Sequence, residues 1–273
     1  MGIGEEAPGM ANAFSHLDAS GIAPEMLVMM ERLDRNAGTL RLGEWAFDLL
    51  AIQPGESVLD AGCGIGFDTV RLASRTGPGG SVLGLDFSDA MITAARSRLT
   101  PDTAQITYAS GDVTALDLPD ASFDVVHCER VLQHLVDPGA AIAELIRVLK
   151  PGGRIAILDT DWATSTSSAG TDEVAEIVLP LTGMIAKSRR IGRQLPSRMV
   201  GAGLSILGVE ASAVMLEPEA ALNPPFTLLP QMAAAAGYDT TVVQAWVDEV
   251  GEHARGGYLV QSVTMIGVVA RKP

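Results

Sequence analysis

The chain has 273 residues, of which 47% are hydrophobic, so it can bury the core of one substantial globular unit. Its 33 Asp and Glu residues outnumber 19 Lys and Arg residues and give a net charge of −14, the opposite of the basic footprint that nucleic acids and anionic membranes select. The two cysteines, Cys63 and Cys128, have no ligand-like spacing, so we expect neither a disulfide framework nor a bound metal.

The first residues contain no basic segment followed by an apolar one, Glu6 breaks the myristoylation pattern, and no stretch approaches ~18 uncharged apolar residues. We therefore expect a cytoplasmic protein that is neither secreted nor anchored. Its partner should be a small molecule rather than a nucleic acid or a membrane. We expect a monomer or a homodimer.

Residues 24–35 and 39–51 have the apolar spacing of amphipathic helices, and a turn at 53–56 leads into the first strand. Residues 57–160 then alternate short β-rich runs with longer helical patterns, which is typical of βαβ units in a parallel sheet. The predicted strands are 57–61, 81–86, 105–110, 123–128 and 153–159, and the predicted helices are 66–76, 88–99 and 138–149. Near-continuous apolar strands indicate a sheet covered on both faces, so the fold class is α/β, doubly wound and Rossmann-like.

Beyond this core the pattern predicts helices at 171–187 and 192–202 and a strand at 204–216. Two further helices, at 228–236 and 240–252, precede a final strand at 258–271. There is no internal repeat and no low-complexity linker, so we interpret residues 1–273 as a single domain.

A glycine-rich turn follows the first predicted strand. Asp60 ends that strand, and Gly62, Gly64 and Gly66 follow at once before a helix begins, which places backbone amides and a helix N-terminus around a ligand. A tight strand-to-helix turn can need the same glycines for its geometry alone.

The next strand ends at Asp86, about 20 residues later, where a carboxylate can accept both ribose hydroxyls of an adenosine. The other interpretation, Asp86 as a helix cap, is a role that Ser88 already fills.

A third acidic residue, Asp112, follows the next predicted strand, where it can accept from an adenine amino group. A surface turn would explain Asp112 equally well if it stood alone.

Five ordered motifs within about residues 40–160, and a weaker one at 268–273, resemble the class I methyltransferases of the ubiquinone/menaquinone-biosynthesis type. The five are Val58-Leu59-Asp60-Ala61-Gly62-Cys63-Gly64-Ile65-Gly66, Leu85-Asp86, Gly111-Asp112, Leu118-Pro119-Asp120-Ala121-Ser122-Phe123-Asp124-Val125-Val126 and Arg147-Val148-Leu149-Lys150-Pro151-Gly152-Gly153.

The resemblance implies that S-adenosylmethionine is the cofactor and that the turn around Cys63 cradles it. It places Gly62 and Gly64 against the methionine and ribose, Asp60 near the ammonium and Asp86 on the ribose. It further implies that Phe87 lies against the adenine, that Asp112 and Val113 lie at its amino edge, and that Cys128 offers its backbone carbonyl to the cofactor's amino group.

The resemblance also implies a seven-stranded sheet whose last strand is antiparallel. N-terminal helices and a helical insert would cap the active site. The expected parts of the domain are 1–52, an N-terminal helical lid; 53–162, the cofactor-binding core; 163–203, the helical insert; and 204–273, the strands and helices that complete the sheet.

The acceptor side has several candidate residues. A hydroxyl acceptor must lose a proton, and His134 follows the fourth strand, where it is placed to serve as the base or to pack beneath the next helix. Family members that methylate sugar or phenolic hydroxyls carry a histidine one position earlier, where this chain has Gln133, a candidate substrate-binding residue. Asp159 and Asp161 alternate after the fifth strand and are the other candidate catalytic residues. Trp162 would wall an aromatic or apolar acceptor.

Several functions remain open. We expect methyl transfer to a small molecule, with a hydroxyl oxygen of a natural product or other secondary metabolite as acceptor. Transfer to carbon or nitrogen is an alternative, and so is a non-methylating rearrangement in natural-product assembly by a protein that binds S-adenosylmethionine. A nicotinamide-dependent oxidoreductase would carry G-x-G-x-x-G, whereas the glycines here stand at 62, 64 and 66 with Phe67 following.

Overall fold

The computed structural model describes residues 24–103, 105–171, 174, 176, 178, 179, 186–222, 226–235 and 237–273. Within them, seven strands form one sheet in the order β3-β2-β1-β4-β5-β7-β6. The strands are β1 (Ser57–Ala61), β2 (Ser81–Asp86), β3 (Ile106–Ser110), β4 (Phe123–Glu129), β5 (Leu149–Ser167), β6 (Ser205–Met215) and β7 (Gln261–Arg271). The first five run parallel, and β7 lies antiparallel between β5 and β6. The predicted α/β fold with an antiparallel last strand is confirmed.

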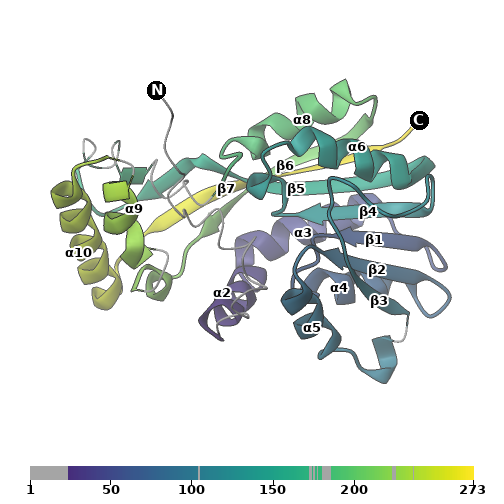
Figure 1. The fold of residues 1–273 in the computed structure, drawn as a ribbon, viewed down its shortest axis with the longest axis horizontal. Coiled ribbons are helices and arrows are strands. Elements are labelled where there is room, and N and C mark those ends of the chain that lie inside the picture. Colours follow the sequence, from purple (N-terminus) through teal and green to yellow (C-terminus); the bar gives the residue numbers. More distant parts are fainter. Residues whose placement is uncertain are drawn as a thin grey trace, which may run out of the picture.

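Helices cover both faces of the sheet (Figure 1). On one face, α3 (Ala37–Leu50), α4 (Phe67–Thr76) and α5 (Asp89–Arg96) enclose a core that includes Phe47 and Leu72. On the other face, α6 (Pro138–Val148) and α8 (Ile191–Gly201) enclose a core that includes Leu145 and Leu195. Because both faces are buried, the central strands are mostly apolar, as the sequence indicated, but they also bury polar residues such as Asp60, His127 and Asp159.

The strand order reverses beside β1. The chain moves from β1 outward to β2 and β3, and then returns to place β4 on the other side of β1. The carboxyl ends of β1 and β4 therefore form the topological switch point, which is where open α/β sheets bind ligands. The glycine-rich turn leaves β1 at this point, and α2 (Pro24–Asp34) lies against it through Met30.

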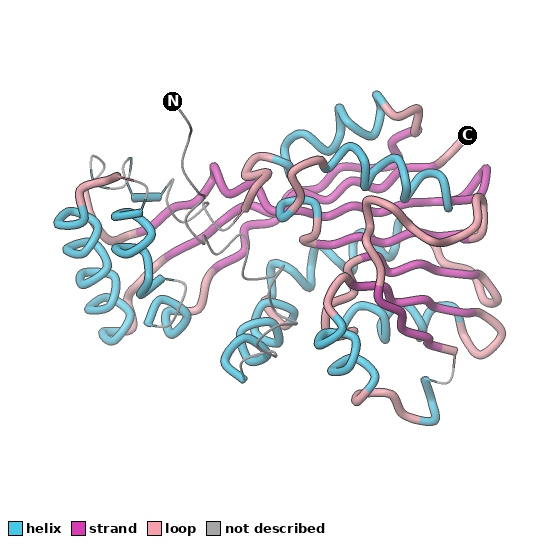
Figure 2. The backbone as a smooth tube through the Cα atoms, in the orientation of Figure 1, coloured by secondary structure: helices cyan, strands magenta, loops and turns pink. Residues whose placement is uncertain are grey.

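A second, smaller core lies at the far end of the sheet. The long strands β5, β6 and β7 lead to a lobe that contains α9 (Leu229–Ala235), α10 (Thr240–Gly256) and the short 3-10 helices η5 (Pro218–Leu222) and η6 (Phe226–Leu228) (Figure 2). Trp246 is the largest fully buried side chain there, and its indole N–H donates to Ala169 O at 3.1 Å. This lobe is separated along the strands from the switch point (Figure 1).

Most predicted elements match the structure within a few residues, and the largest difference is in β5. The sequence predicts a strand over 153–159, whereas β5 spans Leu149–Ser167 because it pairs with β7 from Arg154 to Asp161 and again at Thr166 and Ser167. The strand thus continues past residue 163, the expected start of the helical insert. Residues 1–23, the first part of the expected lid, lie outside the described residues. Most of the helix predicted at 171–187 does as well. Among the described helices, none has the length and apolar character to cross a membrane.

Candidate active site

The glycine-rich turn, residues 62–66, crosses the carboxyl edge of the sheet between β1 and α4. Gly62, Gly64 and Gly66 have φ angles of +76°, +51° and +82°, a region that residues with a Cβ atom rarely adopt. The N–H groups of Gly62 and Cys63 both donate to Leu85 O, at 2.6 and 2.9 Å, so the turn is tied to β2. The glycines therefore set a backbone path that keeps the turn along the ligand-binding edge.

Two of these glycines also allow other elements to approach. A Cβ atom on Gly62 would overlap the side chain of Val131, just after β4, and one on Gly64 would lie 3.0 Å from Cε of Met30 in α2. The glycines thus provide space for the side chains of neighbouring elements. A cofactor that packs on Gly64 must displace Met30, whose unbranched side chain moves readily.

Asp86 links the turn to the start of α5. Its carboxylate accepts from the Gly64 N–H at 2.9 Å and from the Ser88 N–H at 3.0 Å. Ser88 caps α5 by accepting from the Met91 N–H at 3.2 Å, as predicted. Phe87, the next residue after β2, is 60% exposed, although large aromatic rings are usually buried. Asp86 and the uncovered ring of Phe87 thus follow one another in the chain at the carboxyl end of β2.

The other predicted cofactor residues differ in exposure. Asp112 is exposed and accepts from the Thr114 N–H at 2.8 Å and from its hydroxyl at 2.7 Å, so it forms a local turn after β3, with Val113 buried beside it. Cys63 and Cys128 are buried, and burial raises the pKa of both thiols. Neutral, buried thiols leave only backbone groups for a cofactor, which agrees with the backbone role expected for Cys128.

Asp60 is buried beneath the turn and is bonded to protein groups. One carboxylate oxygen accepts from the Thr69 hydroxyl of α4 at 2.6 Å, and the other lies 2.8 Å from Nδ1 of His127 on β4. The residue joins β1, α4 and β4, so it holds the two ends of the switch point together. The sequence offered one signal for this contact, a polar residue at position 127 within an apolar strand.

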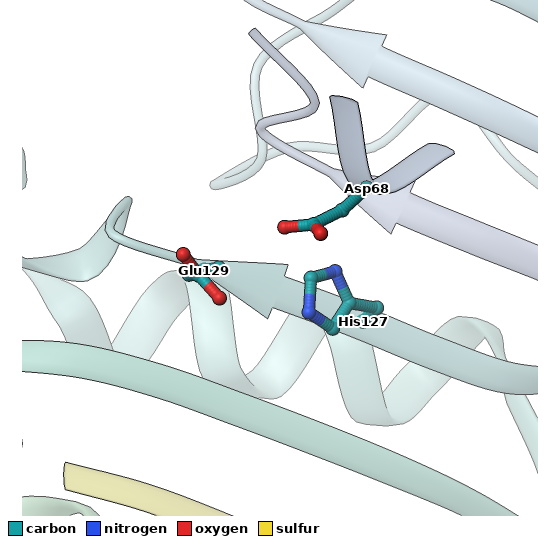
Figure 3. A group of neighbouring side chains, drawn as sticks. All are labelled: Asp68, His127 and Glu129. Carbon is teal, nitrogen blue, oxygen red and sulfur yellow. The ribbon is translucent and has the colours of Figure 1, made fainter. Parts of the chain in front are cut away.

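A second polar cluster, which the sequence analysis missed, contacts Asp60 through His127. Figure 3 shows its three side chains. His127 and Glu129 of β4 and Asp68 of α4 bring their side-chain ligand atoms within 4.8 Å of one another. Burial raises the pKa of Glu129 to about 7, and the nearby Asp68 adds to this rise. Burial opposes a charged His127, but the bond to Asp60 and the surrounding carboxylates still raise its pKa. The cluster therefore brings two acidic side chains and an imidazole together between β4 and α4.

Arg130 connects this cluster to α2. It has a φ of +56°, which is uncommon for a residue other than glycine, and it pairs with Asp34 of α2. Its Nε also donates to Glu129 at 3.0 Å. A strained backbone at the end of a central strand is typical of functional sites, because the surrounding structure must hold it in place.

On the acceptor side, the structure brings the two predicted substrate-binding residues together. Trp162 Nε1 donates to the Gln133 side-chain oxygen at 2.6 Å, so β5 is joined to η3 (Leu132–His134). The Gln133 amide also donates to Arg130 O at 3.1 Å. Trp162 remains partly exposed, and His134 is half-buried at the end of η3. An indole and an imidazole thus follow neighbouring strands at one edge of the sheet.

The two predicted carboxylates lie deeper than these rings. Asp159 is fully buried and accepts from the backbone N–H groups of Thr160 and Gln133 at 2.8 and 3.2 Å. Burial raises the pKa of Asp159 to about 7, although those hydrogen bonds oppose the rise. Asp161 is also buried and pairs with Arg193 of α8. Both carboxylates therefore bond to the protein itself, and they orient η3 and α8.

Comparisons with known proteins agree with this geometry. Residues 52–194 match the family model described as a methyltransferase domain. The chain is 33% identical over 270 residues to an uncharacterized 37.1 kDa protein in transposon TN4556 of Streptomyces fradiae, a match that covers 97% of this chain and 76% of that protein. It is 36% identical over 121 residues to a demethylmenaquinone methyltransferase of Lactobacillus johnsonii, covering 44% of this chain and 50% of that protein.

The fold has solved relatives as well. The crystal structure of the [4+2]-cyclase SpnF is similar with a TM-score of 0.59 and 21% identity, and the match covers 98% of each chain. The family match covers the switch point, the glycine-rich turn, Asp86 and η3. The chain belongs to the methyltransferase-domain family and is a class I S-adenosylmethionine-dependent methyltransferase.

Proposed function

We propose that the protein methylates a hydroxyl oxygen of a small, largely apolar or aromatic acceptor, such as a natural product or another secondary metabolite. The observation that carries the proposal is the bond between Trp162 and Gln133, which joins a partly exposed indole to the residue that precedes His134 in η3. Aromatic side chains favour acceptors with flat apolar bodies. The acceptor would lie on Trp162 with its hydroxyl toward His134.

S-adenosylmethionine, when bound, supplies an electron-poor methyl carbon attached to a sulfonium. A new C–O bond forms as the C–S bond breaks, and the sulfur keeps the electron pair. The acceptor proton must leave, and His134 is the proposed base that takes it. The chain's main contribution is alignment of the acceptor oxygen with the methyl carbon, which by itself provides much of the rate.

Asp159 and Asp161 were the other candidate bases. Asp159 is fully buried and bonded to backbone N–H groups, and Asp161 is paired with Arg193. These contacts support roles as positioning residues, in which Asp159 holds Gln133 and Asp161 holds α8. A half-buried histidine is better placed to exchange a proton with a bound acceptor.

A panel of hydroxylated aromatic and polyketide acceptors tests the proposal, with S-adenosylhomocysteine release as the first measurement and the methylated atom determined by NMR. S-adenosylhomocysteine release also separates methyl transfer from a rearrangement, because a rearrangement leaves the methyl group on the cofactor. This alternative is included because the similar SpnF is called a [4+2]-cyclase. Methylation on oxygen supports the proposal. Methylation only on carbon or nitrogen, or product without S-adenosylhomocysteine, would overturn it.

His134→Ala tests the base once an acceptor is known. We expect kcat to fall by ~10²-fold or more with the affinity for S-adenosylhomocysteine unchanged. His253→Ala in α10 is the matched control, since His253 lies in the lobe. A fully active His134→Ala enzyme would show that His134 is not the base, and alignment of the acceptor with the methyl carbon would then be the remaining catalytic contribution.

We also propose that the protein works in the cytoplasm on a small molecule and not on a nucleic acid, as a monomer or homodimer. The net charge of −14 supports the absence of a nucleic-acid partner, because it disfavours contact with phosphate backbones. Light scattering at working concentration measures the oligomeric state. Salt-sensitive binding to DNA or RNA would contradict the proposal.

A further inference from the structure

Asp68, His127 and Glu129 form a compact buried cluster between α4 and β4, which we call the 68/127/129 cluster. His127 and Glu129 are two residues apart on one strand, so they face the same side of the sheet, and Asp68 approaches from the first turn of α4 (Figure 3). Their ligand atoms all lie within 4.8 Å of one another. Each residue belongs to a chemical type that binds metal ions.

Asp60 orients the imidazole of His127. Because the Asp60 carboxylate accepts at 2.8 Å, Nδ1 carries the hydrogen and Nε2 presents its lone pair to the cluster. His127 is 1% exposed, and its Nε2 has no hydrogen-bond partner among the described residues. A carboxylate behind a histidine, with the second ring nitrogen available, is the usual arrangement of a metal-binding histidine.

The two carboxylates are oriented in the same way. Glu129 uses one oxygen to accept from Arg130 Nε at 3.0 Å, while its buried Oε2 has no hydrogen-bond partner within the described chain. Asp68 uses Oδ1 for an ion pair with Arg71. Each carboxylate is thus held by an arginine through one oxygen, and Glu129 directs an unpaired oxygen into a buried space. Leaving such atoms unpaired is costly, so a bound cation would remove a real penalty.

The charges around the 68/127/129 cluster do not balance. Four carboxylates and two guanidinium groups belong to the cluster or pair with its members, so acidic side chains outnumber arginines there. These groups are Asp34, Asp60, Asp68, Glu129, Arg71 and Arg130. A divalent cation would bind among these acidic groups, where His127 Nε2 and Glu129 Oε2 have no hydrogen-bond partner within the described residues.

We propose that the 68/127/129 cluster binds one divalent metal ion of the Zn²⁺ or Mn²⁺ type, with one imidazole nitrogen and two carboxylate oxygens as ligands. Mixed nitrogen and oxygen donors favour these ions over Mg²⁺ and Ca²⁺, which prefer all-oxygen sites. At a tetrahedral ion, metal–ligand bonds of about 2.1 Å place the ligand atoms roughly 3.4 Å apart, so ligand atoms as far as 4.8 Å apart must approach each other by up to about 1.4 Å. The ion would join α4 to β4 and so brace the glycine-rich turn; it takes no part in methyl transfer.

Metal binding by untagged protein tests this directly. The protein is stripped with a chelator, dialysed and titrated with Zn²⁺, Mn²⁺ or Mg²⁺ alone, with calorimetry, thermal midpoint and metal content by mass spectrometry as measurements. We expect one Zn²⁺ or Mn²⁺ per chain with a raised midpoint, and no comparable effect of Mg²⁺. Folded wild-type protein that takes up neither ion would overturn the proposal.

Three variants locate the ion. Glu129→Gln and Asp68→Asn keep the side-chain shape and remove the charge, and His127→Gln removes the nitrogen ligand; each should weaken metal affinity at least 10-fold. Glu144→Gln, which alters a carboxylate paired with Arg147 away from the cluster, is the matched control and should bind the ion as wild type does. If one variant fails to fold, the other two still show whether the ion binds at the 68/127/129 cluster. Unchanged affinity in the folded variants would place any bound ion elsewhere.

Discussion

Asp86 is the residue on which cofactor affinity should depend most directly. Its carboxylate accepts from Gly64 and Ser88, and the family resemblance implies that it also binds the ribose. We expect Asp86→Ala to raise the dissociation constant for S-adenosylhomocysteine about 10- to 150-fold, the ~1.5–3 kcal/mol of a hydrogen bond to a charged group. Calorimetric titration measures it. Asp102→Ala is the control: it removes the same charge from the exposed helix η2 (Pro101–Thr103) and should leave the affinity unchanged. An unchanged dissociation constant for Asp86→Ala would show that Asp86 does not bind the cofactor.

Asp159 should make the stability of the protein depend on pH. Burial raises the pKa of Asp159 to about 7, whereas an aspartate in the unfolded chain titrates near ~3.9. The folded state therefore binds more protons than the unfolded state between these values, and the free energy of unfolding falls as pH rises through that window. Asp159→Asn removes this dependence, so the variant should gain roughly 1 kcal/mol or more relative to wild type between pH 5 and pH 8.

Urea denaturation at several pH values measures the Asp159 effect. Asp124→Asn is the control, because burial is outweighed at Asp124 by hydrogen bonds from Lys150 and Ser57 that lower its pKa. A carboxyl group with a lowered pKa stabilises the fold above its unfolded pKa and loses that contribution only in acid, so this variant should change little between pH 5 and pH 8. Parallel curves for wild type and Asp159→Asn would show that Asp159 is ionised in the folded protein.

At the scale of elements, the glycine-rich turn depends on contacts as well as on backbone angles. Gly62 and Gly152 have nearly the same φ, +76° and +75°, but a Cβ on Gly62 would overlap Val131, whereas nothing lies within 4 Å of one on Gly152. Gly152→Ala should cost about 1–2 kcal/mol of unfolding free energy for its backbone angle. Gly62→Ala should cost about 1–3 kcal/mol more because of overpacking. Equal losses in urea denaturation would show that Val131 moves freely.

At the scale of the whole molecule, the lobe around Trp246 has its own core, apart from the two cores of the sheet. Trp246→Ala should therefore cost about 3–5 kcal/mol within the lobe. Amide hydrogen exchange should lose protection in α9 and α10, while β1–β4 and S-adenosylhomocysteine affinity stay as in wild type. Phe47→Ala in the sheet core is the control and should expose β1–β4. Faster exchange throughout the chain in Trp246→Ala would show that lobe and sheet unfold as one unit.

The sequence predicted the fold well where the signal is local. β1 and β2 have the expected bounds, 57–61 and 81–86, because apolar runs with glycine turns at their ends specify strands without long-range contacts. The motif order predicted the family as well. Strand β5 was predicted too short, since its extension to Ser167 is stabilised by β7, almost a hundred residues further along the chain. Pairing at that distance leaves no pattern in a local window of sequence.

The residues of the candidate site likewise divide into those that the sequence predicted and those that only the structure revealed. Asp86, Phe87 and Asp112 follow strands of a parallel sheet, so chain order alone placed them at one edge. The sequence did not show that Asp60 bonds to His127, or that Asp68 and Glu129 meet His127 in one buried cluster. Those contacts depend on the register of β1 against β4 and on how α4 packs over both strands. Local periodicity determines which face of a strand is buried, but only tertiary packing decides which polar groups meet there and what charge they enclose.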